Sequence, residues 1–350
     1  YNFLNIIKCI LYLMKLHFIF FIICSSLLIL EIILYLLSNK NNSSSLSKDI
    51  SNDITKPFTM FDWNVAGLPV VYDIKGLKTK IKVNKFSDPN QRVNDILSEI
   101  LSYNPDVICL QEVFDTKFGN KIKRKLETEG YNVLWMKSKK FFDTISCGLL
   151  TATKGKFAGH MFHSYTNEFG EDSSANKGFL YTRIKLNDDN YISVVNTHLQ
   201  ATAIYSTSSV MKILFYKLFK VKQNKEEIKK LSNNTKEKQL KELLNFIKTV
   251  SDIQFLGNDT FFITGDVNST KRTERLKTFN AELKVLTENN VSTLDTEELN
   301  TCCIDNFHIQ YDHMFVFNKN TKLPKITFST SKQDENFFMS DHKPLITVLS

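Results

Sequence analysis

Short apolar runs alternate with amphipathic stretches along most of this chain. The apolar runs predict strands at 58–65, 106–112, 147–153, 178–186, 191–197, 260–265, 311–317 and 345–349. Apolar residues spaced three and four apart predict helices at 92–102, 116–129 and 239–250. Strands and helices that alternate in this way predict a layered α/β domain.

The first part of the chain has a different pattern. Residues 16–37 are almost continuously apolar and are long enough to cross a bilayer as one helix. Met14 followed by Lys15 and an apolar run is also typical of a signal peptide. Both interpretations stay open, and both direct the rest of the protein into the secretory pathway, where it would be membrane-anchored or secreted.

These patterns divide the chain into three parts. Residues 1–38 are assigned to a signal peptide or membrane anchor. Residues 39–55 are rich in Asn and Ser and lack an apolar period, which predicts a linker. Residues 56–350 form the main domain, whose apolar content is ordinary for a globular protein.

Polar side chains recur directly after the predicted strands. In chain order they are Asn64, Glu112, Asn196 with His198, Asp266 with Asn268, and Asp312. Ligands usually bind at strand ends in layered α/β sheets. One such residue would most simply belong to a turn, but five coincident positions indicate a functional site.

Six short segments share their order with a known family. They are Asp62–Pro69, Leu110–Phe114, Asn196–Gln200, Gly265–Asn268, Tyr311–Phe315 and Ser340–Pro344. Together they resemble the successive motifs of the endonuclease/exonuclease/phosphatase superfamily, over roughly residues 58–349. The resemblance implies a DNase I-like, four-layer α/β sandwich, in which two mixed sheets are faced by helices. Residues 56–350 would then be the catalytic domain.

Three segments are similar to the neutral sphingomyelinase branch of that superfamily: Trp63–Pro69, Ala175–Tyr181 and Asn196–Ala201. This resemblance implies a metal-dependent phosphodiesterase that hydrolyses sphingomyelin, or a related phosphosphingolipid, to ceramide and a phosphorylated head group. A DNase-like nuclease and a phosphoinositide phosphatase are alternatives on the same fold. An inactive membrane-binding module is an alternative of another class, and the intact set of candidate catalytic residues argues against it.

Hydrolysis of a phosphodiester requires charge neutralisation on the phosphate and an activated water. Glu112 is an oxygen ligand suited to a hard cation, so we expect Mg²⁺ or Mn²⁺ there. Asn64 would support that metal or a phosphate oxygen, and the resemblance places Asp341 near the metal.

His342 is the expected general base, because an imidazole titrates near neutral pH. Asp312 or Asp341 could orient its second nitrogen, and the resemblance favours Asp312.

The remaining site residues are expected to orient the water, bind the phosphate or stabilise charge in the transition state. Asp266 would orient the water or hold metal, and Asn268 would bind a phosphate oxygen. His198 would stabilise developing charge or assist the leaving group. Lys177 either touches the phosphate or is an exposed lysine at a strand start.

The formal net charge of +8 favours polyanionic partners. We expect a phospholipid membrane surface carrying the sphingolipid substrate, with nucleic acid second, and no protein partner is predicted. Residues 210–221 interleave bulky apolar residues with lysines, which predicts either a lipid-interface segment or a helix packed on the sandwich. The six cysteines suggest neither a disulfide framework nor a zinc site.

Overall fold

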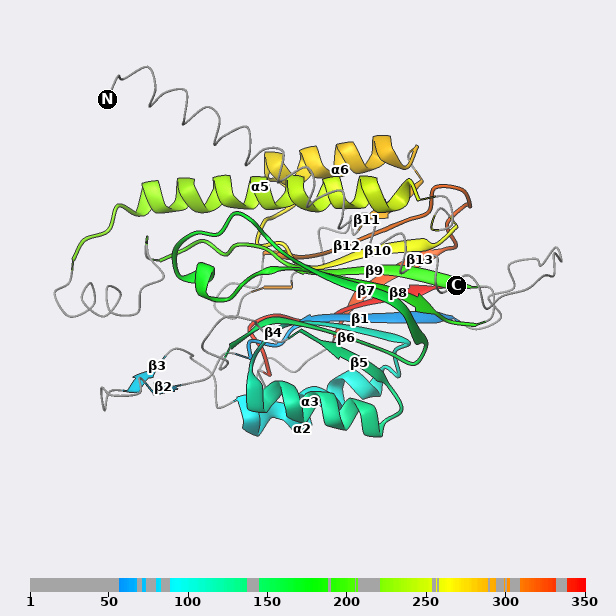
Figure 1. Cartoon of the computed structure of the whole chain (residues 1–350), viewed down its shortest axis with the longest axis horizontal. Helices are drawn as coiled ribbons and strands as arrows, with labels where there is room; N and C mark the ends of the chain where they lie inside the picture. The colour runs from blue at the N-terminus through cyan, green and yellow to red at the C-terminus, as the bar shows by residue number, and fades with distance from the viewer. Residues whose placement is uncertain are drawn as a thin grey trace, which may run out of the picture. The chain divides into compact units, whose positions relative to one another are not determined.

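Two six-stranded sheets, stacked face to face, form the centre of the part of the chain that the structure describes (Figure 1). The structure is a computed structural model. It describes residues 57–67, 71–73, 80–82, 89–136, 145–187, 190–204, 206, 221–253, 256, 258–288, 290–293, 299, 301–302, 309–331 and 339–350. The predicted leader, the linker and residues 210–220 lie outside these ranges. Within them, no helix has the length and apolar character that a bilayer span requires.

The first sheet has the strand order β13-β14-β1-β4-β6-β5. Strands β1 and β4 run parallel, and the other neighbours are antiparallel. The strands are β1 (Phe58–Asn64), β4 (Val107–Asp115), β5 (Asn132–Trp135), β6 (Ile145–Thr153), β13 (Ile326–Thr330) and β14 (Leu345–Leu349).

The second sheet has the order β11-β12-β10-β9-β8-β7, with β9 and β10 parallel and the rest antiparallel. Its strands are β7 (Lys156–Ser164), β8 (Gly178–Lys185), β9 (Tyr191–His198), β10 (Thr260–Asp266), β11 (Val291–Thr293) and β12 (Asp312–Phe317). Strands β2 (Val71–Asp73) and β3 (Lys80–Lys82) pair separately.

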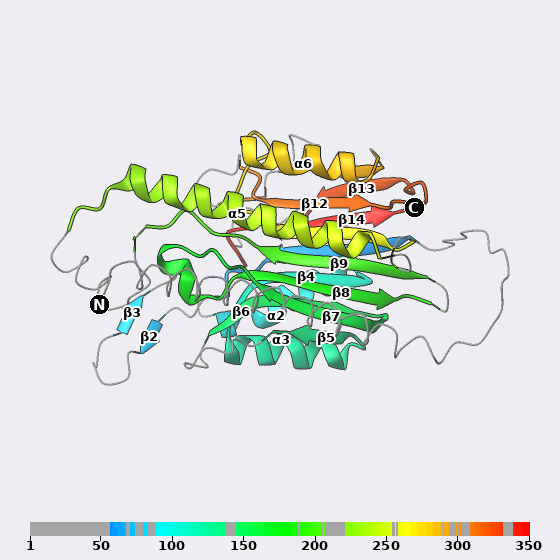
Figure 2. The same ribbon diagram turned by 45° about the horizontal axis from the view of Figure 1, so that its top comes forward.

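Helices cover the outer face of each sheet (Figure 2). Helices α2 (Pro89–Ser102) and α3 (Thr116–Thr128) pack on the first sheet, where Ile96 and Phe118 share a core with Trp63. Helices α5 (Lys225–Ser251) and α6 (Glu274–Leu286) pack on the second sheet. The 3₁₀ turn η2 (Gly170–Ser174) precedes β8. The predicted four-layer α/β sandwich with two mixed sheets is confirmed.

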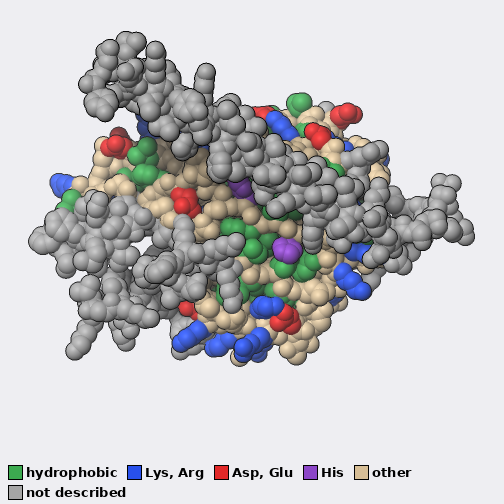
Figure 3. Space-filling model, viewed as in Figure 1, with side chains coloured by type: hydrophobic (Ala, Val, Ile, Leu, Met, Phe, Trp, Pro, Cys, Tyr) green, Lys and Arg blue, Asp and Glu red, His purple; other side chains and the backbone are tan. Residues whose placement is uncertain are grey.

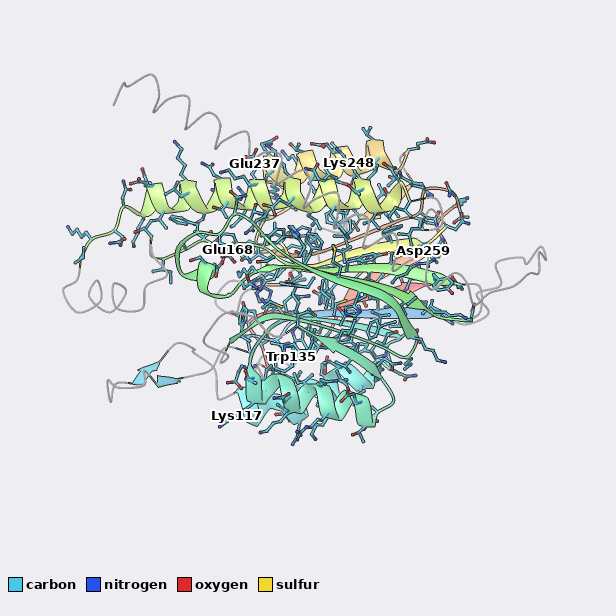
Figure 4. All side chains as sticks on the ribbon, in the orientation of Figure 1. Lys117, Trp135, Glu168, Glu237, Lys248 and Asp259 are labelled. Atoms are coloured by element: carbon cyan, nitrogen blue, oxygen red, sulfur yellow. The ribbon has the colours of Figure 1, made fainter. Side chains whose placement is uncertain are left out.

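The layer between the sheets changes character along the strands. Successive side chains of a strand point to opposite faces, so Phe61 and Trp63 of β1 join the helix-side core whereas Met60 joins the core between the sheets. Further along the same inner row, Asp62 and Asn64 are also buried. Side chains from both sheets fill this layer (Figure 4). At its apolar end the two sheets pack against each other, and its polar end forms the candidate site.

Several observed elements were not predicted. The sequence missed α6, the short strands β2 and β3, and the edge strands of both sheets, which are β5, β7, β11 and β13. Helix α5 begins at Lys225 rather than at residue 239, because Asn224 caps it through a hydrogen bond from the backbone nitrogen of Glu227. Cys302 is disulfide-bonded, a possibility that the sequence left open for one of the adjacent cysteines Cys302 and Cys303.

Candidate active site

Strand register brings three of the expected residues into one row on the second sheet. Asp266, the last residue of β10, lies directly opposite His198 of β9 and opposite Asp312 of β12. All three residues are at most 2% exposed. The sheet itself therefore assembles a buried row of two carboxylates and an imidazole.

A side chain of the first sheet crosses to this row. Nδ2 of Asn64 donates to Oδ2 of Asp266 at 3.0 Å and to Oε1 of Glu112 at 3.2 Å. Oδ1 of Asn64 accepts from the backbone nitrogen of Ala66 at 3.1 Å. In this orientation Asn64 links the two carboxylates, and its role as a direct metal ligand stays a prediction.

Glu112 reaches the site because β4 is irregular at this point. The pairing of β4 with β6 shifts between Leu110 and Val113, and Glu112 has a φ of 58°. A bulge of this kind re-aims a side chain that would otherwise follow the alternation of the strand. Gly67 permits the close approach of the loop after β1, since a Cβ there would lie 2.4 Å from the carbonyl oxygen of Glu112.

The site concentrates negative charge in a buried place. Burial raises the pKa of Glu112 to about 7, with a further contribution from Asp341. Burial likewise raises the pKa of Asp266 to about 6. Ligand atoms of Glu112, His198 and Asp266 all lie within 4.8 Å of one another. Two destabilised carboxylates at this spacing fit a hard divalent cation, which would offset their charge.

His342 and Asp312 form a buried pair beside these carboxylates. Nδ1 of His342 lies 2.7 Å from Oδ2 of Asp312, and Nε2 lies 3.7 Å from Oδ2 of Asp266. Burial by itself lowers the pKa of His342, but Asp312 and Asp266 outweigh it and raise the pKa well above its ordinary value. The arrangement leaves Nε2 facing the cluster as a strong proton acceptor when the ring is neutral.

The loop that carries His342 is fixed to β1. Nε1 of Trp63 donates to the carbonyl oxygen of His342 at 2.8 Å, and Oγ of Ser340 donates to the carbonyl oxygen of Asn64 at 2.6 Å. Arg92 of α2 donates to the carbonyl oxygens of Ala66 and Met339, and so ties both loops together.

Lys177 is buried, with 3% of its surface exposed, so the alternative of an exposed lysine at the strand start is wrong. Its Nζ lies 3.0 Å from Nε2 of His198 and 2.8 Å from Oδ2 of Asp172. Burial lowers the pKa of His198 well below its usual value, and Lys177 and His342 lower it further. His198 is therefore neutral at physiological pH, and its Nε2 accepts from Lys177.

The segment after β10 forms a tight turn. The backbone nitrogen of Asn268 donates to Oδ1 of Asp266 at 2.8 Å, and Nδ2 of Asn268 donates to the carbonyl oxygen of Leu199 at 3.1 Å. Asn268 has a φ of 47°, a left-handed conformation that asparagine tolerates better than most residues. Asp266 and Asn268 are thus held in one local structure.

The structure brings together all nine of the expected site residues, and adds two that the sequence did not suggest. Asp172, the partner of Lys177, lies in the 3₁₀ turn η2, and no sequence motif pointed to it. Arg92 is buried and lies four residues before Ile96, on the apolar side of α2. A charged residue at an apolar position of the predicted helix was the signal available in the sequence.

A family model described as "Endonuclease/Exonuclease/phosphatase family" matches residues 63–342. The chain belongs to this family. The match contains every candidate site residue described above.

Individual relatives match a smaller part of the chain. A Sphingomyelinase C of Bacillus cereus is 32% identical over 111 residues, which are 28% of this chain and 33% of the relative. Sphingomyelin phosphodiesterase 3 of Homo sapiens is 28% identical over 106 residues, 28% of this chain and 16% of that protein. The matched region therefore spans a third or less of the length of either relative.

Solved structures extend the likeness of the fold. SmcL superposes with a TM-score of 0.60 at 17% identity, covering 84% of this chain and 99% of that one. A beta toxin from Staphylococcus aureus with bound magnesium ions gives 0.57 at 17% identity, covering 84% and 100%. D. rerio TDP2, complexed with a single-strand DNA product, gives 0.54 at 14% identity, covering 84% and 99%.

Proposed function

We propose that this chain is a metal-dependent phosphodiesterase that hydrolyses sphingomyelin, or a related phosphosphingolipid, to ceramide and a phosphorylated head group. The observation that carries the proposal is the His342–Asp312 pair, separated by 2.7 Å and facing the carboxylates of Asp266 and Glu112. The two relatives named for sphingomyelin cleavage support the choice of substrate.

His342 acts as the base in this proposal. Its Nδ1–H is donated to Asp312, so Nε2 is the nitrogen that takes a proton from water. The water oxygen forms a new bond to phosphorus while the bond from phosphorus to the ceramide oxygen breaks. The ceramide oxygen takes a proton from solvent as it leaves, His342 returns its proton to solvent, and the products are ceramide and the phosphorylated head group.

A divalent cation, Mg²⁺ or Mn²⁺, would be held by Glu112 with Asp266 and Asp341, and would offset negative charge on the phosphate. Asn268 donates one Nδ2 hydrogen to the carbonyl oxygen of Leu199 and has a second that can bind a phosphate oxygen. Nζ of Lys177 contacts His198, Asp172 and the same carbonyl oxygen, so Lys177 would bind a phosphate oxygen by exchanging one of these contacts.

The proposed substrate lies in a membrane, so a lipid surface is the partner that we propose. Ile204, in the loop after β9, is 69% exposed. Val221, just before α5, is 38% exposed, and Leu231, within α5, is 39% exposed. Exposed apolar residues of this kind can enter a lipid interface. The secretory-pathway assignment depends on residues 1–38 and stays a prediction.

A nuclease is the second candidate, and it would use the same base and cation. Basic side chains gather over α3 in Figure 3, and the exposed basic residues of this helix are Lys117, Lys121, Arg124 and Lys125. Such a face can attract nucleic acid as well as anionic lipid. The single-strand DNA in the TDP2 structure makes this alternative worth a direct assay.

Hydrolysis of choline-labelled sphingomyelin vesicles by the full chain tests the proposal. We expect Mg²⁺-dependent release of phosphocholine that EDTA abolishes and that His342→Ala lowers by about a hundredfold or more. His160→Ala is the matched control, because His160 is an exposed histidine of β7 and should leave the rate unchanged. Cleavage of single-stranded DNA without phosphocholine release would replace the lipid substrate by the nuclease alternative.

A further inference from the structure

Lys236 is a lysine of α5 that points into the protein. Only 3% of its surface is exposed, whereas Lys229, Lys230 and Lys238 on the same helix are exposed. Helix α5 lies across the outer face of the second sheet, near the ends of β9 and β10 (Figures 1 and 2). Lysine is almost never fully buried without a partner, so its contacts are informative.

The partners of Lys236 are neutral oxygens of the loops that build the site. Its Nζ donates to the backbone carbonyl of Asn268 at 2.8 Å and to Oγ1 of Thr202 at 3.3 Å. Within the described ranges, no carboxylate forms an ion pair with it. Burial of an ammonium group costs several kcal/mol unless its interactions offset that cost, so these contacts must be strong ones.

The turn that Lys236 holds is the one that carries Asp266 and Asn268. Asn268 has a φ of 47°, a left-handed conformation that costs most residues about 1 to 2 kcal/mol and asparagine less. The next carbonyl, that of Ser269, accepts from Nε2 of His313 at 2.8 Å. The carbonyl oxygens of Asn268 and Ser269 therefore both accept hydrogen bonds from residues outside the turn. The same turn carries Asp266, which belongs to the candidate active site.

We propose that Lys236 is a positioning residue for this turn: its ammonium group holds the carbonyl of Asn268 and so keeps the Asn268 amide and the Asp266 carboxylate aimed at the reacting phosphate. The inference rests on the proposed function of Asp266 and Asn268, and adds a residue from the helical layer to the site. Lys236 touches neither substrate nor cation.

The charge state of Lys236 agrees with this role. Burial, together with Arg275, lowers the pKa of Lys236 to about 8, and the carboxylates of Asp266 and Asp172 counteract that effect. The side chain is therefore mostly charged at neutral pH, and hydrogen bonds from a charged donor are roughly twice as strong as neutral ones.

The test compares Lys236→Met with Lys236→Arg in the full chain. We expect Lys236→Met to lower kcat by about ten- to a hundredfold, the effect of losing a hydrogen bond from a charged group, with KM changed by less than about twofold. Lys236→Arg keeps a charged donor and should recover most of the rate. Lys241→Met is the matched control, because Lys241 is an exposed lysine of α5 paired with Glu237.

Both sphingomyelin vesicles and bis(4-nitrophenyl) phosphate, a soluble phosphodiester, serve as substrates. The inference would be overturned if folded Lys236→Met had the same kcat as the wild type, or if only its KM changed. If Lys236→Met fails to fold, the neutral variant Lys236→Gln replaces it and the same outcomes apply. Hydrolysis of the soluble diester alone would reject the lipid substrate while still testing Lys236, and no hydrolysis of either would reject both proposals.

Discussion

Asn64 and Asp266 belong to different sheets, yet Nδ2 of Asn64 lies 3.0 Å from Oδ2 of Asp266. The same nitrogen lies 3.2 Å from Oε1 of Glu112. One amide therefore joins the two sheets at the polar end of the sandwich and separates two carboxylates. The amide of Asn64 suits this place because it donates a hydrogen bond to each carboxylate without adding a further negative charge.

Replacing that amide by a carboxylate should be costly. Asn64→Asp puts a third acidic group beside Asp266 and Glu112 and removes the donor that they share. We expect the free energy of unfolding to fall by about 1 to 3 kcal/mol, measured by urea denaturation in EDTA. Asn234→Asp, an exposed change on α5, is the control. Equal stability of the two variants would show that the carboxylates do not depend on Asn64.

Asp312 should be essential for catalysis and not for folding. Asp312→Asn keeps the shape of the side chain but removes the charge 2.7 Å from Nδ1 of His342. We expect kcat to fall by about a hundred- to ten-thousandfold, the range of general-base catalysis. The pKa of His342 should fall as well, because Asp312 is one of the carboxylates that raise it. The acid limb of the kcat–pH profile should therefore move to lower pH, and an unmoved limb would contradict this role.

Glu112 should couple stability to pH and to metal. Burial raises its folded-state pKa to about 7, above the value of about 4.3 in the unfolded chain. Between these two pKa values the folded state binds more protons than the unfolded state. The contribution of Glu112 to the free energy of unfolding therefore falls as pH rises from about 4 to about 7. In EDTA, Glu112→Gln should flatten this dependence, as measured by thermal unfolding across that range.

Mg²⁺ should have the opposite effect on the wild-type protein. At a hundred times its dissociation constant, a bound ion stabilises the folded state by about 2.7 kcal/mol, and Glu112→Gln should lose this gain at the same concentration. Glu226→Gln, an exposed carboxylate of α5, should retain it. A metal response in Glu112→Gln equal to that of the wild type would place the cation elsewhere.

Asp62 lies behind the site and should limit stability. It is fully buried; its Oδ1 accepts from Gln111 at 2.8 Å, and its Oδ2 has no hydrogen-bond partner among the residues that the structure describes. Burial raises the pKa of Asp62 well above its ordinary value, and Asp312 and Asp266 add to the shift. Asp62→Asn keeps an acceptor for Gln111 and cannot ionise.

We expect Asp62→Asn to be more stable than the wild type by about 1 to 3 kcal/mol at pH 7, because on folding the wild-type carboxyl must either take up a proton or bury its charge, and an amide does neither. The raised pKa makes wild-type stability fall as pH rises above about 4, so the gain should shrink in acid. Unfolding at pH 4 and pH 7 measures both, and a gain independent of pH would contradict this origin.

The site shows which parts of the prediction were accessible from residue order alone. The six ordered motifs predicted Glu112, Asp266, Asp312 and His342 together. They did not predict that a bulge with a φ of 58° aims Glu112 into the site, since a bulge depends on how two strands pair. Nor did they suggest Lys236, because nothing in its mixed-charge surroundings in the sequence distinguishes it from the exposed lysines beside it.

The sequence by itself determined the alternation of strands and helices, the family, and the residue types at the strand ends. These properties follow from side-chain periodicity and from short motifs that are contiguous in the chain. Tertiary structure alone decided the burial of Lys177, the partnership of Asn64 with Asp266, and the contact of Lys236 with the Asn268 carbonyl. Each of these joins residues far apart in the chain, and their distances are set by how two sheets and a helix pack, which local patterns do not encode.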